Sequence, residues 1–327
     1  MARLPLTLAC WDYDRTRALR DGSIKPEGID LTMLTLRPSQ TFPRMLKHKE
    51  FDVSEMSFSS YCALKAQDDC PFVAIPVFPS KIFRHDCIYV NVDAGIERPE
   101  DLAGKRIGSA RYDMTAALFA RGMLHHEYGV TPQSVEWFYG PQEELGGFSA
   151  APHKTPVNIS VSHIAKGKIL SQMLEEGELD ALIGVVIPEP FLRGSAKVKR
   201  LFPNFKEAEQ EYFRRTRIFP IMHTVVIREE IFKEHPYVAR SLYDAFTAAK
   251  DQAAEQYYDT DALRVMLPFL LADLEETWEL MGKDFWAYGV EPNRPTIEAL
   301  LQFLHDQELA DRVLSPEELF APSTLVI

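Results

Sequence analysis

The sequence has few cysteines, and none of them forms a recognisable pair. Its 327 residues include only Cys10, Cys62, Cys70 and Cys87, with no CxxC spacing and no histidine at the distance that zinc sites use. We therefore expect reduced, mostly buried thiols. HExxH and EF-hand patterns are absent as well, so the sequence gives no local signature for a bound metal ion, and none is expected.

Long apolar runs and a leader-like start are also missing. No uncharged apolar stretch reaches the roughly 18 residues of a membrane-spanning helix, and an apolar run such as Ala181 to Ile187 has the length of a strand. Met1 to Thr7 carries no small-residue cleavage site and soon meets the charged Asp12 and Asp14. We expect a protein without a membrane span, located in the cytoplasm.

The sequence has fewer positively than negatively charged residues. The chain has 36 Lys and Arg against 48 Asp and Glu, a formal net charge of −12 at pH 7, and its basic residues are scattered. Such a chain repels a polyanion, so nucleic acid is not an expected partner. GxGxxG, Walker A and nucleophile-elbow patterns are absent, and Gly146-Gly147 stands in a breaker-rich loop. No cofactor is therefore expected.

The sequence does contain enough apolar material for two cores. Hydrophobic residues make up 46% of its 327 positions, and a chain of this length commonly divides. Leu4 to Cys10 alternates like a strand, Gly28 to Leu34 follows as a second strand, and Gln40 to His48 has helical spacing. This order is typical of a βαβ unit.

A second βα unit begins near Pro99, and the apolar run Ile218 to Ile227 leads back towards the first. We predict an α/β protein of two lobes with a ligand cleft between them. Residues 1–95 and 222–327 form lobe one, and 96–221 form the inserted lobe two. Helices predicted to pack on lobe one are Tyr237–Tyr257, Thr260–Leu271, Asp273–Tyr288 and Thr296–Gln307. The Pro- and Gly-rich stretch 140–158 predicts a long loop.

Four motifs, taken in order, resemble the 4,5-dihydroxyphthalate decarboxylase family. They are Asp12-Tyr13-Asp14-Arg15-Thr16, Lys25 to Leu31, Phe83-Arg84-His85 and Phe219 to Ile227. The similarity spans nearly the whole chain, and the lobe order resembles the type II periplasmic binding protein fold, whose ligands bind between the lobes. The resemblance implies a carboxy-lyase that converts 4,5-dihydroxyphthalate, or a close analogue, to protocatechuate. Trp11 stands where the family mostly has glycine, which bears on the ring substituents accepted.

Loss of carbon dioxide from such a ring sets the residue types to look for. A hydroxyl para to the carboxylate lets the ring accept a proton at the ipso carbon, so the site needs a proton donor, cations for carboxylates and an acceptor for the phenol. His223 and His85 are the candidate proton donors, since imidazole titrates near neutrality and both lie in segments that link the lobes. Asp12 is the candidate to hold a histidine tautomer or accept a phenolic proton.

The candidate substrate-binding residues lie near predicted strand ends and helix starts. They are Trp11, Arg15, Ser57, Ser59, Arg84, Arg111, Asp113, Thr115 and Glu189. The arginines offer a planar fork for a carboxylate, and the hydroxyls lie at helix starts that favour anions. Each type also has a structural use, as a surface charge, a helix cap or a turn residue. His125 and His126, adjacent on a predicted helix, should diverge by about 100° and form no metal pair.

Two other functions would use the same cleft. A solute-binding or sensing protein would bind an aromatic carboxylate without reaction, although the absent leader argues against transport. A dehydratase like those of the menaquinone pathway would also bind a carboxylated ring. The contexts Arg84-His85 and Met222-His223 favour decarboxylation. The many C-terminal helices are compatible with a homo-oligomer.

Overall fold

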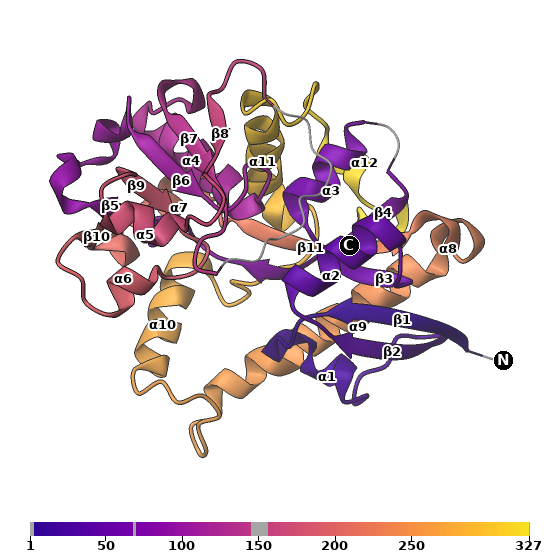
Figure 1. The fold of residues 1–327 in the computed structure, drawn as a ribbon. Coiled ribbons are helices and arrows are strands. Elements are labelled where there is room, and N and C mark those ends of the chain that lie inside the picture. The colour runs from indigo at the N-terminus through magenta and orange to yellow at the C-terminus, as the bar shows by residue number, and fades with distance from the viewer. Residues whose placement is uncertain (1–2, 68–69, 145–155, 327) are drawn as a thin grey trace.

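Two β-sheets organise the chain (Figure 1). The computed structural model describes residues 3–67, 70–144 and 156–326. The first sheet has the strand order β2-β1-β3-β11-β4 and consists of β1 (Leu4–Cys10), β2 (Ile29–Thr35), β3 (Val53–Ser57), β4 (Phe72–Lys81) and β11 (Ile221–Arg228). The second has the order β10-β5-β9-β6-β7-β8 and consists of β5 (Ile88–Asn91), β6 (Arg106–Ser109), β7 (Glu136–Tyr139), β8 (Val161–His163), β9 (Ala181–Ile183) and β10 (Val198–Arg200).

The sheets are mixed, and their parallel strands fix where polar residues gather. In the first sheet β1 runs parallel to β2 and β3, whereas β11 pairs antiparallel with both β3 and β4. In the second sheet β6 runs parallel to β7 and β9. The carboxyl ends of β1, β3, β6 and β9 are therefore the natural edges for a ligand site.

The chain crosses between the sheets twice. The first crossing lies between β4 and β5, because β5 pairs with β9 and β10 in the second sheet. This is earlier than the boundary at residues 95 and 96 that the sequence suggested. The return runs through β11, which begins at Ile221, next to the expected boundary at 222. The predicted loop at 140–158 falls largely on residues 145–155, outside the described residues.

Twelve α-helices of the described residues cover the sheets. They are α1 (Arg17–Arg20), α2 (Pro38–His48), α3 (Phe58–Lys65), α4 (Thr115–Tyr128), α5 (Leu170–Glu175), α6 (Glu189–Leu192), α7 (Phe205–Thr216), α8 (Glu229–Glu234), α9 (Tyr237–Glu255), α10 (Leu270–Met281), α11 (Arg294–Asp306) and α12 (Pro316–Leu319). Local chemistry sets many ends: Pro38 occupies the first turn of α2, and Gly129 ends α4 with a φ of 69° that a side chain would resist. In the part of the chain that is described, no helix has the length and apolar character to cross a membrane.

The C-terminal helices are distributed differently from the prediction. α9 packs on the first sheet, along β4 and α1, as expected. α11 instead contacts both α3 and α4, so it joins the two lobes (Figure 1), and α10 reaches α7 through ion pairs of Lys206 with Asp273 and Glu276. The predicted helix Thr260–Leu271 is wrong over most of its length, since Pro268 prevents a regular helix there and α10 begins at Leu270. α10 then ends at Met281, before Gly282 and short of the predicted end.

Candidate active site

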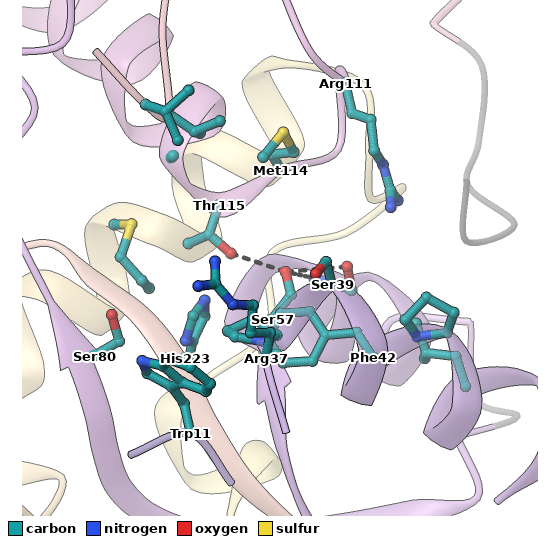
Figure 2. Close-up of a pocket in the computed structure, with 18 of the residues that line it drawn as sticks. Trp11, Arg37, Ser39, Phe42, Ser57, Ser80, Arg111, Met114, Thr115 and His223 are labelled. Atoms are coloured by element: carbon teal, nitrogen blue, oxygen red, sulfur yellow. Dashed lines mark hydrogen bonds between the residues drawn. The ribbon is translucent and has the colours of Figure 1, made fainter. Parts of the chain in front are cut away.

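A cavity of about 540 Å³ lies between the two sheets (Figure 2). Its walls come from both lobes and consist of Trp11, Arg37, Pro38, Ser39, Phe42, Pro43, Leu46, Lys47, Ser57, Ser60, Ser80, Arg84, Arg111, Met114, Thr115, Ala116, Val185, Val186, Met222 and His223. The volume is within the usual range for a small-molecule site. Residues just beyond β1, β6 and β9 and at the end of β3 contribute, as the parallel strands require.

His223 is the titratable ring of this cavity. It lies on β11 opposite Ser57 of β3, and its side chain is 17% exposed. Its Nδ1 lies 2.6 Å from Oε1 of Glu55, and the ring of Phe42 packs edge-on against it at 5.0 Å. Because Nδ1 is engaged by a carboxylate, that nitrogen carries a proton and Nε2 is left for the cavity. The histidine is thereby oriented for proton transfer.

Glu55 lies behind His223 and is fully buried. Besides His223, it accepts hydrogen bonds from the Tyr13 hydroxyl at 2.6 Å and from the backbone N–H of Trp11 at 2.9 Å. Burial by itself would raise the pKa of Glu55, but the charge and hydrogen bond of His223, helped by Tyr13 and the Trp11 amide, lower it below its usual value. Glu55 is therefore a carboxylate, and its Oε1 lies 2.6 Å from Nδ1 of His223.

Tyr13 completes this buried group. Its hydroxyl is also 3.4 Å from Nδ1 of His223. Burial and then the Glu55 charge raise the pKa of Tyr13 above its usual value. The phenol thus stays protonated and donates to Glu55. The Glu55 carboxylate and the Tyr13 hydroxyl therefore both lie next to Nδ1 of His223.

Two guanidinium groups on the cavity wall have no ion-pair partner within the described residues, those of Arg37 and Arg84. The Arg37 guanidinium lies 5.2 Å from the centre of the Trp11 ring. Arg84 reaches the Met222 sulfur through Nη2 at 2.7 Å, while its buried Nε has no hydrogen-bond partner in the described part of the chain. An anion with several oxygens would satisfy both groups.

Arg111 also lines the cavity, but a carboxylate already binds it. Its Nε donates to Oδ1 of Asp113 at 2.8 Å, and its Nη2 donates to the other oxygen of the same group. Asp113 is buried behind the wall. Arg111 therefore contributes less net charge to the cavity than Arg37 or Arg84.

A group of hydroxyls links the two lobes across the cavity. The Oγ of Ser57 lies 3.0 Å from Oγ1 of Thr115, the contact drawn in Figure 2, and 3.1 Å from Oγ of Ser60. Ser57 also caps α3. These hydroxyls can donate to an oxyanion or accept from a phenol, and the remaining walls are mostly apolar: Trp11, Phe42, Leu46, Met114, Val185, Val186 and Met222. The cavity thus suits a flat, apolar ring with polar substituents.

Half of the predicted site residues lie at this cavity. They are Trp11, Ser57, Arg84, Arg111, Thr115 and His223. Ser59 and Asp113 are one layer behind: the Ser59 hydroxyl donates to the Asp113 carbonyl at 2.6 Å. Their positions support the wall without facing a ligand.

The structure contradicts four of the predicted positions. The His85 side chain is only 1% exposed, with its ring between Phe202 and Tyr212, and burial, followed by the Arg215 charge, lowers its pKa to about 4. It is therefore neutral near pH 7, and it does not line the cavity. Asp12 forms an ion pair with Arg20 at 2.5 Å and does not line the cavity.

Arg15 and Glu189 also point elsewhere. The Arg15 guanidinium stacks on Trp286 at 4.2 Å and lines a second cavity of about 330 Å³ next to α9 and α10. Glu189 is exposed at the start of α6 and forms an ion pair with Arg193 at 3.1 Å. Local turn chemistry and nearby charges, rather than a ligand, account for both positions.

Sequence reasoning missed Tyr13 and Glu55, which surround His223, and Arg37 on the cavity wall. Tyr13 lies within the motif Asp12 to Thr16, in which the predicted site residues are Asp12 and Arg15. Glu55 is a charged residue in the run Phe51 to Met56, and a lone acid on a buried strand is itself a signal, since buried charges need partners. Arg37 precedes Pro38 at a helix start and carried no comparable signal.

Comparisons with known proteins agree on fold and family. A family model described as ABC transporter, phosphonate, periplasmic substrate-binding protein matches residues 27–153. The 4,5-dihydroxyphthalate decarboxylase of Comamonas testosteroni is 38% identical over 325 residues, covering 99% of this chain and 98% of the relative. The enzyme of the same name from Pseudomonas putida is 37% identical over 214 residues, covering 65% and 83%.

Among solved structures, the periplasmic aliphatic sulphonate binding protein SsuA from Escherichia coli has a TM-score of 0.53 at 10% identity, with 99% of each chain covered. At that identity the likeness shows the fold alone. The predicted periplasmic-binding-protein-like fold is confirmed, and so is the family resemblance read from the four motifs.

Proposed function

The chain belongs to the 4,5-dihydroxyphthalate decarboxylase family, and we propose that it removes one carboxylate of 4,5-dihydroxyphthalate in the cavity around His223. The predicted carboxy-lyase activity is supported by both named relatives. The observation that carries the proposed site is the buried Glu55, whose carboxylate holds Nδ1 of His223 in a cavity that also contains two guanidinium groups without ion-pair partners in the described residues.

The substrate's shape and charge suit the walls. Its two adjacent carboxylates carry two negative charges at neutral pH, and Arg37 and Arg84 supply two positive charges in a protein of net charge −12. Charge-assisted hydrogen bonds to these groups would orient the ring. The apolar surfaces of Trp11, Phe42 and Met114 cover its faces. The hydroxyls of Ser57 and Thr115 are available to the phenolic oxygens.

The chemical step needs one proton and no external electrons. The imidazolium of His223 gives its Nε2 proton to the ipso carbon, and ring electrons form the new C–H bond while the para phenolic oxygen supports the resulting positive charge. The bond to the carboxylate carbon then breaks, its electron pair restores the aromatic ring, and carbon dioxide leaves. The neutral imidazole takes a proton from solvent, so each turnover consumes one proton.

Glu55 and Tyr13 position the donor without touching the substrate. Glu55 fixes the tautomer and orientation of His223 and stabilises the charged form from which the proton leaves. Tyr13 in turn holds Glu55 through its hydroxyl. Neither residue lines the cavity. Their contribution should therefore be seen in turnover rather than in substrate binding.

The two alternative functions are less well supported. A sensing protein needs the arginines and the apolar walls but has no use for a buried carboxylate behind a histidine. A dehydratase is likewise not favoured, since the two named relatives are decarboxylases.

The direct test is product analysis with purified, EDTA-treated protein. 4,5-Dihydroxyphthalate is incubated alongside phthalate, which has both carboxylates but no hydroxyl to support the ring charge. We expect one equivalent of carbon dioxide and protocatechuate from the first, and binding without release from the second. Tight binding of both without release would favour the sensing protein. Release that requires added metal would contradict proton donation by His223 as the whole mechanism.

A further inference from the structure

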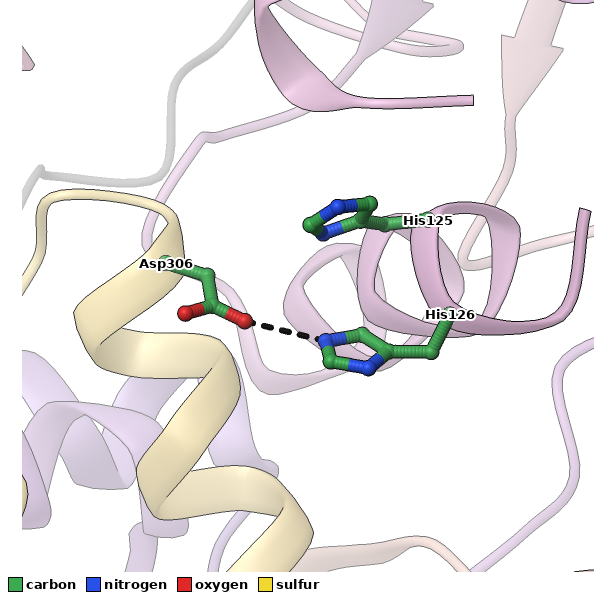
Figure 3. Close-up of side chains that lie close together, drawn as sticks. All are labelled: His125, His126 and Asp306. Carbon is green, nitrogen blue, oxygen red and sulfur yellow. Dashed lines mark hydrogen bonds and ion pairs between the residues drawn. The ribbon is translucent and has the colours of Figure 1, made fainter. Parts of the chain in front are cut away.

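A second group of titratable side chains lies outside the cavity, at the junction of two helices. His125 and His126 occupy the last turn of α4, and Asp306 is the last residue of α11 (Figure 3). One ligand atom from each lies within 4.8 Å of the other two. The reaction that we propose at His223 does not involve these three side chains.

The structure brings together side chains that the sequence separates. The adjacent histidines were expected to diverge around their helix, but their ring centres are 4.7 Å apart. Asp306, 180 residues further along the chain, approaches from α11, with Oδ2 2.9 Å from Nε2 of His126. The third ligand is thus supplied by tertiary packing, which no local spacing reveals.

Neighbouring residues hold two of the three groups in place. The Gln302 amide donates to Oδ1 of Asp306 at 2.7 Å, which leaves Oδ2 directed at the histidines. The Phe303 ring lies 5.0 Å from the His126 ring. Partners of this kind orient metal ligands in known sites. The two helices can approach closely because Gly122 on α4 has no side chain at the place where Phe303 packs.

The electrostatic setting favours a cation. Both α4 and α11 end at this group, and each helix carries partial negative charge at its carboxyl end. Two imidazoles and one carboxylate form a donor set typical of zinc and similar transition ions, whereas Mg²⁺ and Ca²⁺ prefer oxygen.

We propose that His125, His126 and Asp306 bind a divalent transition-metal ion of the zinc type, with water in the remaining position. Ligand atoms at about 2.0–2.1 Å from a tetrahedral ion are about 3.3 Å from one another. The three ligand atoms now lie within 4.8 Å of one another, so rotation of these exposed or half-buried side chains brings them to the distances that the ion requires. When the ion binds Nε2 of His126, the hydrogen of the neutral imidazole is carried by Nδ1 instead.

The bound ion joins parts of both lobes. α4 lies in the chain between β6 and β7 of the second sheet, and α11 contacts α3 of the first lobe as well as α4. An ion between their ends therefore opposes separation of the two helices and stabilises the folded state by mass action. It does not enter the decarboxylation, because at about 1.5 Å per residue His125 lies about 15 Å along α4 from Thr115 at the cavity.

Zinc chloride titrated into the purified, EDTA-stripped full-length protein tests the site. Isothermal calorimetry gives affinity and stoichiometry, and Co²⁺ absorption reports four-coordinate geometry. Variants His125→Ala and Asp306→Asn each remove one ligand, the second without changing shape. His305→Ala is the matched control: its Nδ1 lies 3.8 Å from Oδ1 of Asp306, but it is not one of the three ligands, so its loss should leave zinc binding intact. His223→Ala removes the histidine of the cavity as a competing ligand.

We expect one equivalent of zinc to bind the wild type, His305→Ala and His223→Ala with similar affinity. Loss of one ligand should weaken binding by about 100-fold or more. Zinc should raise the melting temperature of the wild type and leave both ligand variants unchanged. Circular dichroism confirms that each variant is folded. Absence of binding to the wild type at about 100 µM zinc would overturn the proposal. So would a zinc affinity of His125→Ala and Asp306→Asn equal to that of the wild type.

Discussion

Replacing Glu55 by glutamine should uncouple substrate binding from turnover. Glu55 receives three hydrogens, from Nδ1 of His223, the Tyr13 hydroxyl and the Trp11 amide. Glutamine has the same shape but only one acceptor oxygen. If that oxygen faces His223 and Tyr13, its amide hydrogens oppose the Trp11 N–H. The opposite orientation satisfies Trp11 and lets the amide donate to Tyr13 and to Nδ1 of His223.

The second orientation sets the size of the effect. A donor facing Nδ1 holds His223 as the neutral tautomer with its proton on Nε2, and the imidazolium loses its ion-pair partner. Positioned proton transfer is worth about 10²–10⁴ in rate, and the comparable Asp-to-Asn change in serine proteases lowers kcat by about 10⁴. We expect Glu55→Gln to lose about 10²–10³ in kcat. Because Glu55 does not line the cavity, KM should change by less than about threefold.

Carbon dioxide release under saturating substrate measures kcat, and ligand titration measures binding. Tyr13→Phe removes one hydrogen bond to Glu55 and should cost about 2–10-fold in kcat, the value of a single hydrogen bond. Asp12→Asn serves as the control, since its ion pair with Arg20 leaves the cavity untouched. Melting curves show whether each variant is folded. A folded Glu55→Gln enzyme with wild-type kcat would refute the positioning role of Glu55.

Three further predictions concern the cavity wall, a buried acid and a helix contact. Arg84→Met should raise KM for 4,5-dihydroxyphthalate about 10-fold or more, the value of hydrogen bonds to a charged group, and an unchanged KM in steady-state kinetics would remove Arg84 from the binding site. Burial, and then the charge of Asp86, raises the pKa of Glu209 from 4.5 to about 7, so folding favours its neutral form and its stabilising effect is lost as pH rises through that range. Glu209→Gln should therefore have a higher melting temperature than wild type above pH 7 but not below pH 4.5. Equal melting temperatures of the two proteins above pH 7 would contradict this prediction. A Cβ on Gly122 would lie 2.2 Å from the Phe303 ring, so Gly122→Ala should lose about 1–3 kcal/mol in denaturant unfolding, and wild-type stability would show that α11 shifts freely.

Local patterns predicted the individual strands better than their assembly. The alternation in Leu4 to Cys10 coincides with β1, and the apolar run before Arg228 contains β11. Periodicity reports which face of an element is buried, but not what covers it. α11 was therefore assigned to one lobe although Phe303 packs against α4 of the other. The first lobe crossing was misplaced for the same reason, since β5 finds its partners far along the chain.

The candidate site was predictable where function depends on position along a strand. Ser57 is the last residue of β3, and His223 lies near the start of β11, so the antiparallel pairing of these strands brings the two together. The role of Glu55 depends on a contact across 168 residues, which one sequence does not contain. Asp12 and Arg15 lie in the expected loop, but Arg20 and Trp286 turn their side chains away. A loop's place can be predicted from sequence, whereas the direction of each side chain depends on tertiary neighbours.

The central claim is that His223 donates the proton that releases carbon dioxide. The measurement that tests it most directly compares substrate affinity and turnover of His223→Ala with those of the wild type, using His48→Ala, an exposed histidine on α2, as the control. Substrate binding by His223→Ala should stay within a few-fold of wild type while its turnover falls by about 10² or more, and both quantities should be unchanged in the control. A folded His223→Ala protein that releases carbon dioxide at the wild-type rate would contradict it.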